Sequence, residues 1–268
     1  MSSDSFHVSR DGDVATVTMA TPTMTPAFFR DCERVFRELG DDAGLRAIVV
    51  RGSDKAFCYG LDLRAAFAEW GPTLSGGGLA KNRTELLGLI KQLQRALTAI
   101  ADVPVPTIAA IHGWCIGGGI DLISACDLRI CSADAKFSIR ETRVAMVADI
   151  GTLQRLPRII GKGHMRELAF TGKDVDARRA EKIGLVNDIY ADRAALDEAA
   201  TALAREIAAA PPLVVRGVKH VLDVCEDRTI EEGLDYVAVW NSAFLASEDL
   251  GEATAAFVQK RTPVFKGR

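Results

Sequence analysis

The sequence predicts an α/β fold in which largely parallel strands alternate with helices. Short runs rich in β-branched residues indicate strands, and helical patterns lie between them. Such alternation is typical of strands joined by helical crossovers. The predicted strands cover residues 14–20, 47–51, 107–111, 128–131 and 185–190, and the predicted helices cover residues 26–39, 82–101 and 119–126.

The last part of the chain differs from the rest because almost only helical patterns follow Ala191. Residues 192–209 are rich in alanine, Pro211 and Pro212 open the next helix, and Ser247 caps the last one. A helical tail without strands usually packs on the main layer or on a neighbouring subunit. We therefore expect a core domain over residues 1–190 and a helical C-terminal region over residues 191–268.

The composition fits one globular core. A chain of 268 residues with 48% hydrophobic content can bury one sizeable core, or one core plus a small appendage. The glycine-rich segment 71–78 is expected to be a flexible loop, too short to link two domains. A net charge of −3 gives no general attraction for nucleic acid or for an anionic membrane. No apolar run approaches the length of a membrane span.

The cysteines and histidines give no indication of a bound metal. The six cysteines include no CxxC pair and several lie in apolar runs, which predicts reduced, buried thiols. His7, His164 and His220 lack the spacing of metal ligands. The first residues resemble neither a signal peptide nor a transit peptide, and the last residues are not a peroxisomal address. We therefore expect a cytoplasmic protein.

Three carboxylates follow a glycine turn closely in the sequence. Asp121, Glu141 and Asp149 come just after the Gly117-Gly118-Gly119 run. A glycine turn that leads into a helix presents backbone N–H groups to an anion. Several acids near such a turn suggest proton transfer beside a stabilised oxyanion.

The glycine turn alone is weak evidence for an anion site. It lacks the GxGxxG spacing and the GK[ST] ending of nucleotide-phosphate loops, and tight backbone packing is the more common reason for such a run. A second loop over residues 56–63, with Gly60 at its centre, follows the predicted strand 47–51. Two such loops can direct two N–H groups at one oxygen, which is the minimum for an oxyanion hole.

Four motifs together resemble the crotonase (enoyl-CoA hydratase/isomerase) superfamily. They occur in order between about Val14 and Phe265, and they read AFCYGLDL, IHGWCIGGGIDLISACDLRICSADAKFSI, GTLQRLPRIIG and TGKDVDARRAEKIGLV. The resemblance implies a crotonase-like ββα spiral core with a helical C-terminal trimerisation region. It also implies acyl-CoA thioester substrates, no cofactor beyond the coenzyme A of the substrate, and a homotrimer or dimer of trimers.

The same resemblance assigns roles to individual residues. The backbone N–H groups of Leu61 and Gly118 would form the oxyanion hole. Arg64, Phe257 and Lys260 fall where the family contacts coenzyme A, with Lys260 offered from a neighbouring subunit. The segment 21–25 is shorter than the family's usual one, which puts the adenine contacts of that segment in doubt.

The three acids resemble those of the Δ3,5-Δ2,4-dienoyl-CoA isomerases of fatty acid β-oxidation. Asp121 stands where hydratases usually carry Glu, Glu141 matches the second hydratase glutamate, and Asp149 replaces a small or apolar residue. By this resemblance Glu141 is the base at C2 and Asp149 the acid at C6. Asp121 would orient these groups or tune their charge. We expect burial to raise the pKa of Asp149, and a helix N-terminus to keep Asp121 ionised.

Structural roles are the alternative for each acid taken alone. Asp121 could be a helix-dipole partner, Asp149 an N-cap, and Glu141 a surface ion-pair partner of Arg140 or Arg143. Two other functions stay open for the whole chain. One is an enoyl-CoA hydratase that uses Asp121 and Glu141 on water, and the other is a catalytically silent binding protein.

Overall fold

A computed structural model describes residues 3–76 and 78–268. Its main sheet has six strands in the order β1-β2-β3-β4-β6-β9. The β1–β2 pair is antiparallel and every other pair in this sheet is parallel, as predicted for an α/β fold. The strands are β1 (Phe6–Asp11), β2 (Val14–Met19), β3 (Ala47–Arg51), β4 (Thr107–Ile111), β6 (Leu128–Ser132) and β9 (Asp188–Tyr190).

A second, smaller sheet lies beside the main one and contains three short strands in the order β5-β7-β8. They are β5 (Trp114–Ile116), β7 (Lys136–Ser138) and β8 (Val175–Asp176). β5 directly follows β4, and β7 directly follows β6, so the chain passes from the large sheet to the small one before it enters the next helix. This repeated strand–strand–helix order confirms the expected ββα spiral.

The main sheet is buried on both faces. Residues of β3 alternate between two cores, because successive side chains of a strand point to opposite faces. Ile48 and Val50 join the larger core, whereas Ala47 and Val49 join the smaller one under α8 (Arg193–Ala209). The helices that border the larger core are α1 (Pro26–Gly40), α3 (Ala80–Ala101), α4 (Gly118–Ser124), α5 (Thr152–Ile159), α6 (Gly161–Thr171) and α7 (Ala177–Lys182).

One predicted loop is partly helical. Helix α2 (Leu63–Leu74) includes the first four residues of the segment 71–78, and Pro72 lies inside its last turn. The loop prediction is wrong there because the start of the helix is fixed by Asp62, whose side chain accepts a hydrogen bond from the Ala65 N–H at 2.9 Å. Gly77, within the same segment, lies outside the described residues.

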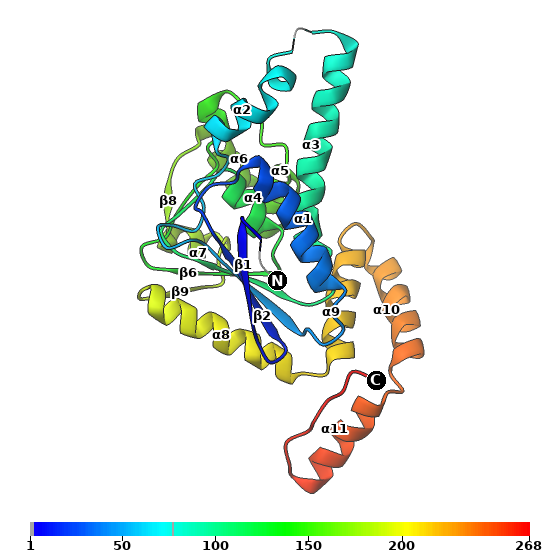
Figure 1. The fold of residues 1–268 in the computed structure, drawn as a ribbon. Helices are drawn as coiled ribbons and strands as arrows, with labels where there is room; N and C mark the ends of the chain where they lie inside the picture. The colour runs from blue at the N-terminus through cyan, green and yellow to red at the C-terminus, as the bar shows by residue number, and fades with distance from the viewer. Residues whose placement is uncertain (1–2, 77) are drawn as a thin grey trace.

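The C-terminal helices leave the core in stages. α8 still packs on the main sheet, whereas α10 (Ile230–Phe244) and α11 (Glu248–Gln259) extend away from it (Figure 1). α9 (Pro212–Cys225) connects α8, which packs on the sheet, to α10. The Ser247 hydroxyl caps α11 as predicted, accepting a hydrogen bond from the Leu250 N–H at 3.1 Å. No helix in the described part of the chain is both long and apolar enough to cross a membrane.

Candidate active site

The two glycine-containing loops lie side by side. Cys58 and Cys115 form a parallel bridge, and the Ile116 N–H donates to the Cys58 carbonyl at 2.8 Å. Gly60 has a φ of +85°, which favours glycine, and a Cβ there would lie 2.9 Å from the Ile116 carbonyl oxygen. A Cβ at Gly119 would lie 2.9 Å from that of Cys58. The glycines therefore allow the loops to approach backbone to backbone.

This approach brings two free amides to one place. Gly118 begins α4, so its N–H has no carbonyl partner within the helix. Leu61 and Met24 form a parallel bridge. Its hydrogen bonds run from Met24 to the residues before and after Leu61, so the bridge does not use the Leu61 N–H. Among the described residues, no oxygen accepts a hydrogen bond from the Leu61 or Gly118 N–H. Both groups are therefore available to an oxyanion.

Asp121 is the most deeply buried of the three acids, with 1% of its surface exposed. Its Oδ1 accepts a hydrogen bond from the Thr152 N–H, the first amide of α5, at 2.6 Å. Its Oδ2 is buried without a partner in the described structure. Burial raises the pKa of Asp121 to about 7, and the charges of Glu141 and Asp149 add to that rise against the hydrogen bonds from Thr152.

The expectation that Asp121 stays ionised because it begins a helix is therefore wrong. Its carboxyl group does lie at a helix N-terminus, but at that of α5 rather than at that of its own helix α4. The interaction with α5 does not outweigh the loss of water around a carboxyl group that is almost completely buried.

Glu141 begins the short 3₁₀ helix η1 (Glu141–Val144) and faces the glycine turn. A Cβ at Gly117 would lie 3.2 Å from Oε1 of Glu141, so the carboxyl group occupies the space that glycine leaves open. Burial raises the pKa of Glu141. The surface ion pair considered for this residue does not form in the described structure, where Arg140 pairs with Asp174 at 2.7 Å instead.

Asp149 lies on the exposed loop that leads from η1 to α5. Partial burial of its carboxyl group raises its pKa, as the sequence predicted. The alternative role as an N-cap is wrong, because α5 begins at Thr152 and its first amide binds Asp121. The Gln94 side chain on α3 donates a hydrogen bond to the Asp149 carbonyl oxygen at 2.6 Å and so supports the loop.

The three carboxyl groups act on one another electrostatically. The charges of Glu141 and Asp149 both raise the pKa of Asp121, and the charge of Asp149 also raises the pKa of Glu141. Groups that interact in this way take up protons as a set. Within residues 3–76 and 78–268, no cluster of histidine, cysteine or acidic side chains has an arrangement that could hold a metal ion.

The proposed coenzyme A contacts lie far apart within one chain. Arg64 is in the first turn of α2, whereas Phe257 and Lys260 are at the end of α11. α2 and α11 lie at opposite ends of the molecule (Figure 1). Phe257 is 86% exposed and makes no part of the described core. One chain alone therefore does not bring these three residues together.

Sequence reasoning missed Thr152, Gln94 and Arg155 as parts of this site. Thr152 and Arg155 lie in the GTLQRLP motif, but nothing in that motif reveals that its first amide binds a carboxylate 31 positions earlier. Gln94 is one polar residue of a long helix, and only the fold shows which carbonyl it reaches.

Residues 9–268 match the enoyl-CoA hydratase/isomerase family. A mitochondrial Δ(3,5)-Δ(2,4)-dienoyl-CoA isomerase of Dictyostelium discoideum is 44% identical over 91% of this chain and 83% of its own length. A peroxisomal isomerase of the same name from Arabidopsis thaliana is 43% identical, over 89% and 86%. A putative enoyl-CoA hydratase structure from Streptomyces coelicolor A3(2) superimposes with a TM-score of 0.90 at 32% identity, covering 98% of this chain and 94% of that one.

These names correct one expectation. The isomerases from D. discoideum and A. thaliana are named as mitochondrial and peroxisomal proteins, and this conflicts with the cytoplasmic location expected here. That prediction is wrong, because compartment addresses are short removable or receptor-read segments that the residues of a folded core do not reveal. The family match covers nearly the whole chain, including every strand from β2 to β9 and all three acids. The chain is an enzyme that belongs to the enoyl-CoA hydratase/isomerase family.

Proposed function

We propose that the protein converts 3,5-dienoyl-CoA to 2,4-dienoyl-CoA in fatty acid β-oxidation. The observation that carries this proposal is the third acid, Asp149, which interacts with Glu141 and Asp121 beside the free Gly118 amide. Relatives more than 40% identical over most of the chain have the name of this activity. A shift of two double bonds needs proton transfer at two distant carbons, which two separate carboxyl groups can perform.

The first step removes a proton from C2. Glu141, as a carboxylate, takes this proton, and the electron pair of the broken C–H bond moves into the thioester to form a dienolate. The negative charge gathers on the thioester oxygen, where the Leu61 and Gly118 N–H groups stabilise it. Preorganised N–H donors of this kind contribute most where charge develops in the transition state.

The second step adds a proton at C6. Asp149, whose raised pKa favours the protonated form, donates that proton while the electron pairs shift to give double bonds at C2 and C4. Glu141 then holds a proton and Asp149 has lost one. Exchange with solvent, which reaches the exposed loop of Asp149, returns both groups to their starting states. Asp121 carries no proton to the substrate in this scheme and instead tunes the charge of the other two acids.

Incubation with two substrates tests the assignment. The purified enzyme is given 3,5-dienoyl-CoA and 2-enoyl-CoA, and the conjugated dienoyl absorbance and the formation of the 3-hydroxyacyl product are followed separately. Rapid formation of the 2,4-dienoyl product with slow hydration supports the isomerase. Rapid hydration without isomerisation would support the enoyl-CoA hydratase alternative. The reason to test this alternative is the similarity to the S. coelicolor structure, which is named as an enoyl-CoA hydratase. The absence of both reactions would indicate a catalytically silent binding protein.

The protein assembles as a trimer or as a dimer of trimers in this proposal. α9 and α10 expose large apolar side chains that an isolated chain leaves in water, and such patches are typical of interfaces. These side chains are Val214, Val218, Leu222, Ile230, Leu234 and Val239. Assembly would also let α11 of one subunit reach the site of the next. Light scattering at micromolar concentration checks this, and a monomer would contradict it.

A further inference from the structure

Two ionisable side chains, those of Asp121 and Arg155, lie beside the start of α5. Asp121 reaches the Thr152 N–H with Oδ1, at 2.6 Å. Arg155 folds back along its own helix, and its Nη1 would lie only 1.9 Å from a Cβ at Gly151. The guanidinium therefore fills the space that a side chain at position 151 would occupy. The carboxylate and the cation flank the same peptide unit, between Gly151 and Thr152.

Arg155 has no carboxylate partner of its own in the described structure. Its Nη2 donates a hydrogen bond to the Thr98 hydroxyl at 3.0 Å, and its Nη1 is buried without a partner. A buried charge is costly unless it is paired. Burial lowers the pKa of Arg155, and of the charges that oppose this effect Asp121 is the strongest. The unpaired Nη1 and the unpaired Oδ2 of Asp121 are both enclosed in this part of the protein.

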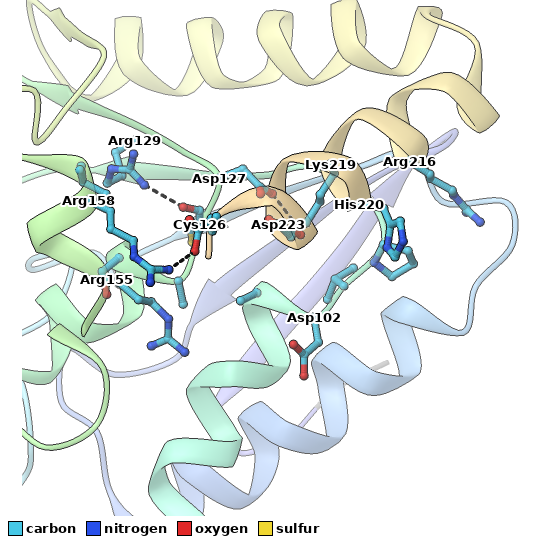
Figure 2. Close-up of a pocket in the computed structure, with 17 residues that line it drawn as sticks. Asp102, Cys126, Asp127, Arg129, Arg155, Arg158, Arg216, Lys219, His220 and Asp223 are labelled. Atoms are coloured by element: carbon cyan, nitrogen blue, oxygen red, sulfur yellow. Dashed lines mark hydrogen bonds and ion pairs between the residues drawn. The ribbon is translucent and has the colours of Figure 1, made fainter. Parts of the chain in front are cut away.

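Arg155 also borders an open polar cavity of about 610 Å³, which is lined by the ends of α3 and α4 and by residues of α5 and α9 (Figure 2). Two other cations of this cavity are paired with acids. Arg158, almost one turn further along α5, binds Glu226 and Asp227. Lys219 binds Asp127 at 2.8 Å. Arg155 differs from both, because it forms no ion pair in the described structure and the charge that most raises its pKa is that of Asp121.

We propose that Arg155 is a positioning residue that lies behind Asp121 and favours the ionised form of this carboxyl group, against the effect of its burial. The inference rests on the proposed function only in placing Asp121 within the acid set. Arg155 sets how many protons Asp121, Glu141 and Asp149 share at neutral pH. With the cation present, the set releases its protons at a lower pH, and these include the proton that Glu141 must lose to act as a base.

Other charged groups face this pair and enter the balance. Glu141 and Asp149 face Asp121 and favour its protonated form, and the thiol of Cys58 lies on the same side. Asp102 at the end of α3 and Glu226 after α9 face Arg155 and favour its charged form, as does Cys126.

The test compares three variants by the titration of Asp121 itself. Arg155→Met removes the charge and keeps an unbranched apolar stem, Arg155→Lys restores a charge, and Arg158→Met is the matched control on the same helix and cavity. The carboxyl carbons of aspartate are labelled with ¹³C, and Asp121→Asn assigns the signal. An opposite charge within about 4–6 Å shifts a carboxyl pKa by roughly 1–3 units.

We expect the Asp121 midpoint to rise by about one unit or more in Arg155→Met. It should return toward the wild-type value in Arg155→Lys and stay unchanged in Arg158→Met. The acid limb of the kcat profile for dienoyl isomerisation should move with it, giving about a tenfold loss one unit below the wild-type midpoint and recovery at higher pH.

An unchanged Asp121 midpoint in folded Arg155→Met would overturn the proposal, as would an equal loss of activity at every pH. If Arg155→Met does not fold, Arg155→Gln, which is neutral and can still donate to Thr98, gives the same titration. The titration needs no turnover. A wild-type enzyme without isomerase activity would therefore refute the proposed function and leave the role of Arg155 to be decided by the midpoints.

Discussion

The two halves of the candidate site are built from different materials. The oxyanion half consists of backbone, and the glycines at 60 and 119 leave less than 3 Å for any added side chain. The acid half consists of side chains on α4, on η1 and on the exposed loop before α5. Backbone packed this closely tolerates little change. On the proposed function, the acid half could change one residue at a time, and the reaction would then change while the two amides that stabilise the thioester oxygen stay in place.

The variant Asp149→Asn should separate the halves most sharply. The amide cannot deliver a proton to C6, so dienoyl isomerisation should fall by roughly two to four orders of magnitude. Exchange of the C2 hydrogen with solvent should survive, because Glu141 and the two amides remain. The dienoyl absorbance and the loss of deuterium from C2 measure the two steps. Near-normal dienoyl turnover in this variant would remove Asp149 from the reaction and favour the hydratase.

The variant Asp121→Asn tests the burial of the acid half through stability. The folded protein raises the pKa of Asp121 from 3.8 to about 7, so the native state holds a proton that the unfolded chain releases. The free energy of unfolding should therefore fall as pH rises from about 4 to about 7, by on the order of 4 kcal/mol from this group.

Asparagine has no such proton to lose, and its carbonyl can still accept from the Thr152 N–H. Denaturant unfolding should show that the stability of the variant relative to the wild type is clearly greater at pH 8 than at pH 5. Parallel stability curves for the two proteins would mean that Asp121 is solvated enough to ionise freely.

The variant Gly60→Ala tests the backbone half. An added Cβ would meet the Ile116 carbonyl at 2.9 Å and would strain a backbone with φ of +85°, which moves the Leu61 amide. Isomerisation and C2 exchange should both fall, by about 10²- to 10³-fold, the usual effect of losing one oxyanion donor. Gly12→Ala is the control, because Gly12 also has a positive φ, of +61°, with no atom within 4 Å of the added Cβ. A decrease in isomerisation without a decrease in C2 exchange would contradict this prediction. It would show that the oxyanion half and the acid half do not act independently.

The smallest effect is expected from Gln94→Leu, which removes the support of the Asp149 loop. One hydrogen bond contributes about 0.5–1.5 kcal/mol, so kcat should fall roughly three- to tenfold. C2 exchange should not change, because Glu141 lies on η1. Gln92→Leu, on the same helix, is the matched control. An equal decrease in both variants would indicate a general effect of α3 rather than a contact with the loop.

The sequence predicted the central strands better than the edges. β3 and β4 begin and end where the patterns placed them, because both are continuous apolar runs buried on both faces. β1 was missed because most of its side chains are exposed, and β5 and β7 because three residues are too few for a period to show. The order of strands and helices was sufficient for the fold class.

The candidate site was predicted as a set of residues but not as an environment. The position of Asp121 in the sequence gave no indication that it binds the amide of Thr152, since that contact depends on how α4 and α5 pack. The same holds for Arg155, whose side chain turns back toward Gly151. Local sequence shows which groups can titrate, whereas their surroundings come from segments far apart in the chain.

The hydrogen bond from the Thr152 N–H to Asp121 gives the enzyme a built-in indicator. At 2.6 Å this amide senses directly whether its acceptor carries a charge or a proton. Its ¹⁵N and ¹H resonances will therefore follow the proton on Asp121 without a label on the substrate or on the acid. Recorded during binding of a substrate analogue, the same signal reports whether the enzyme takes up or releases a proton before any bond in the acyl chain changes.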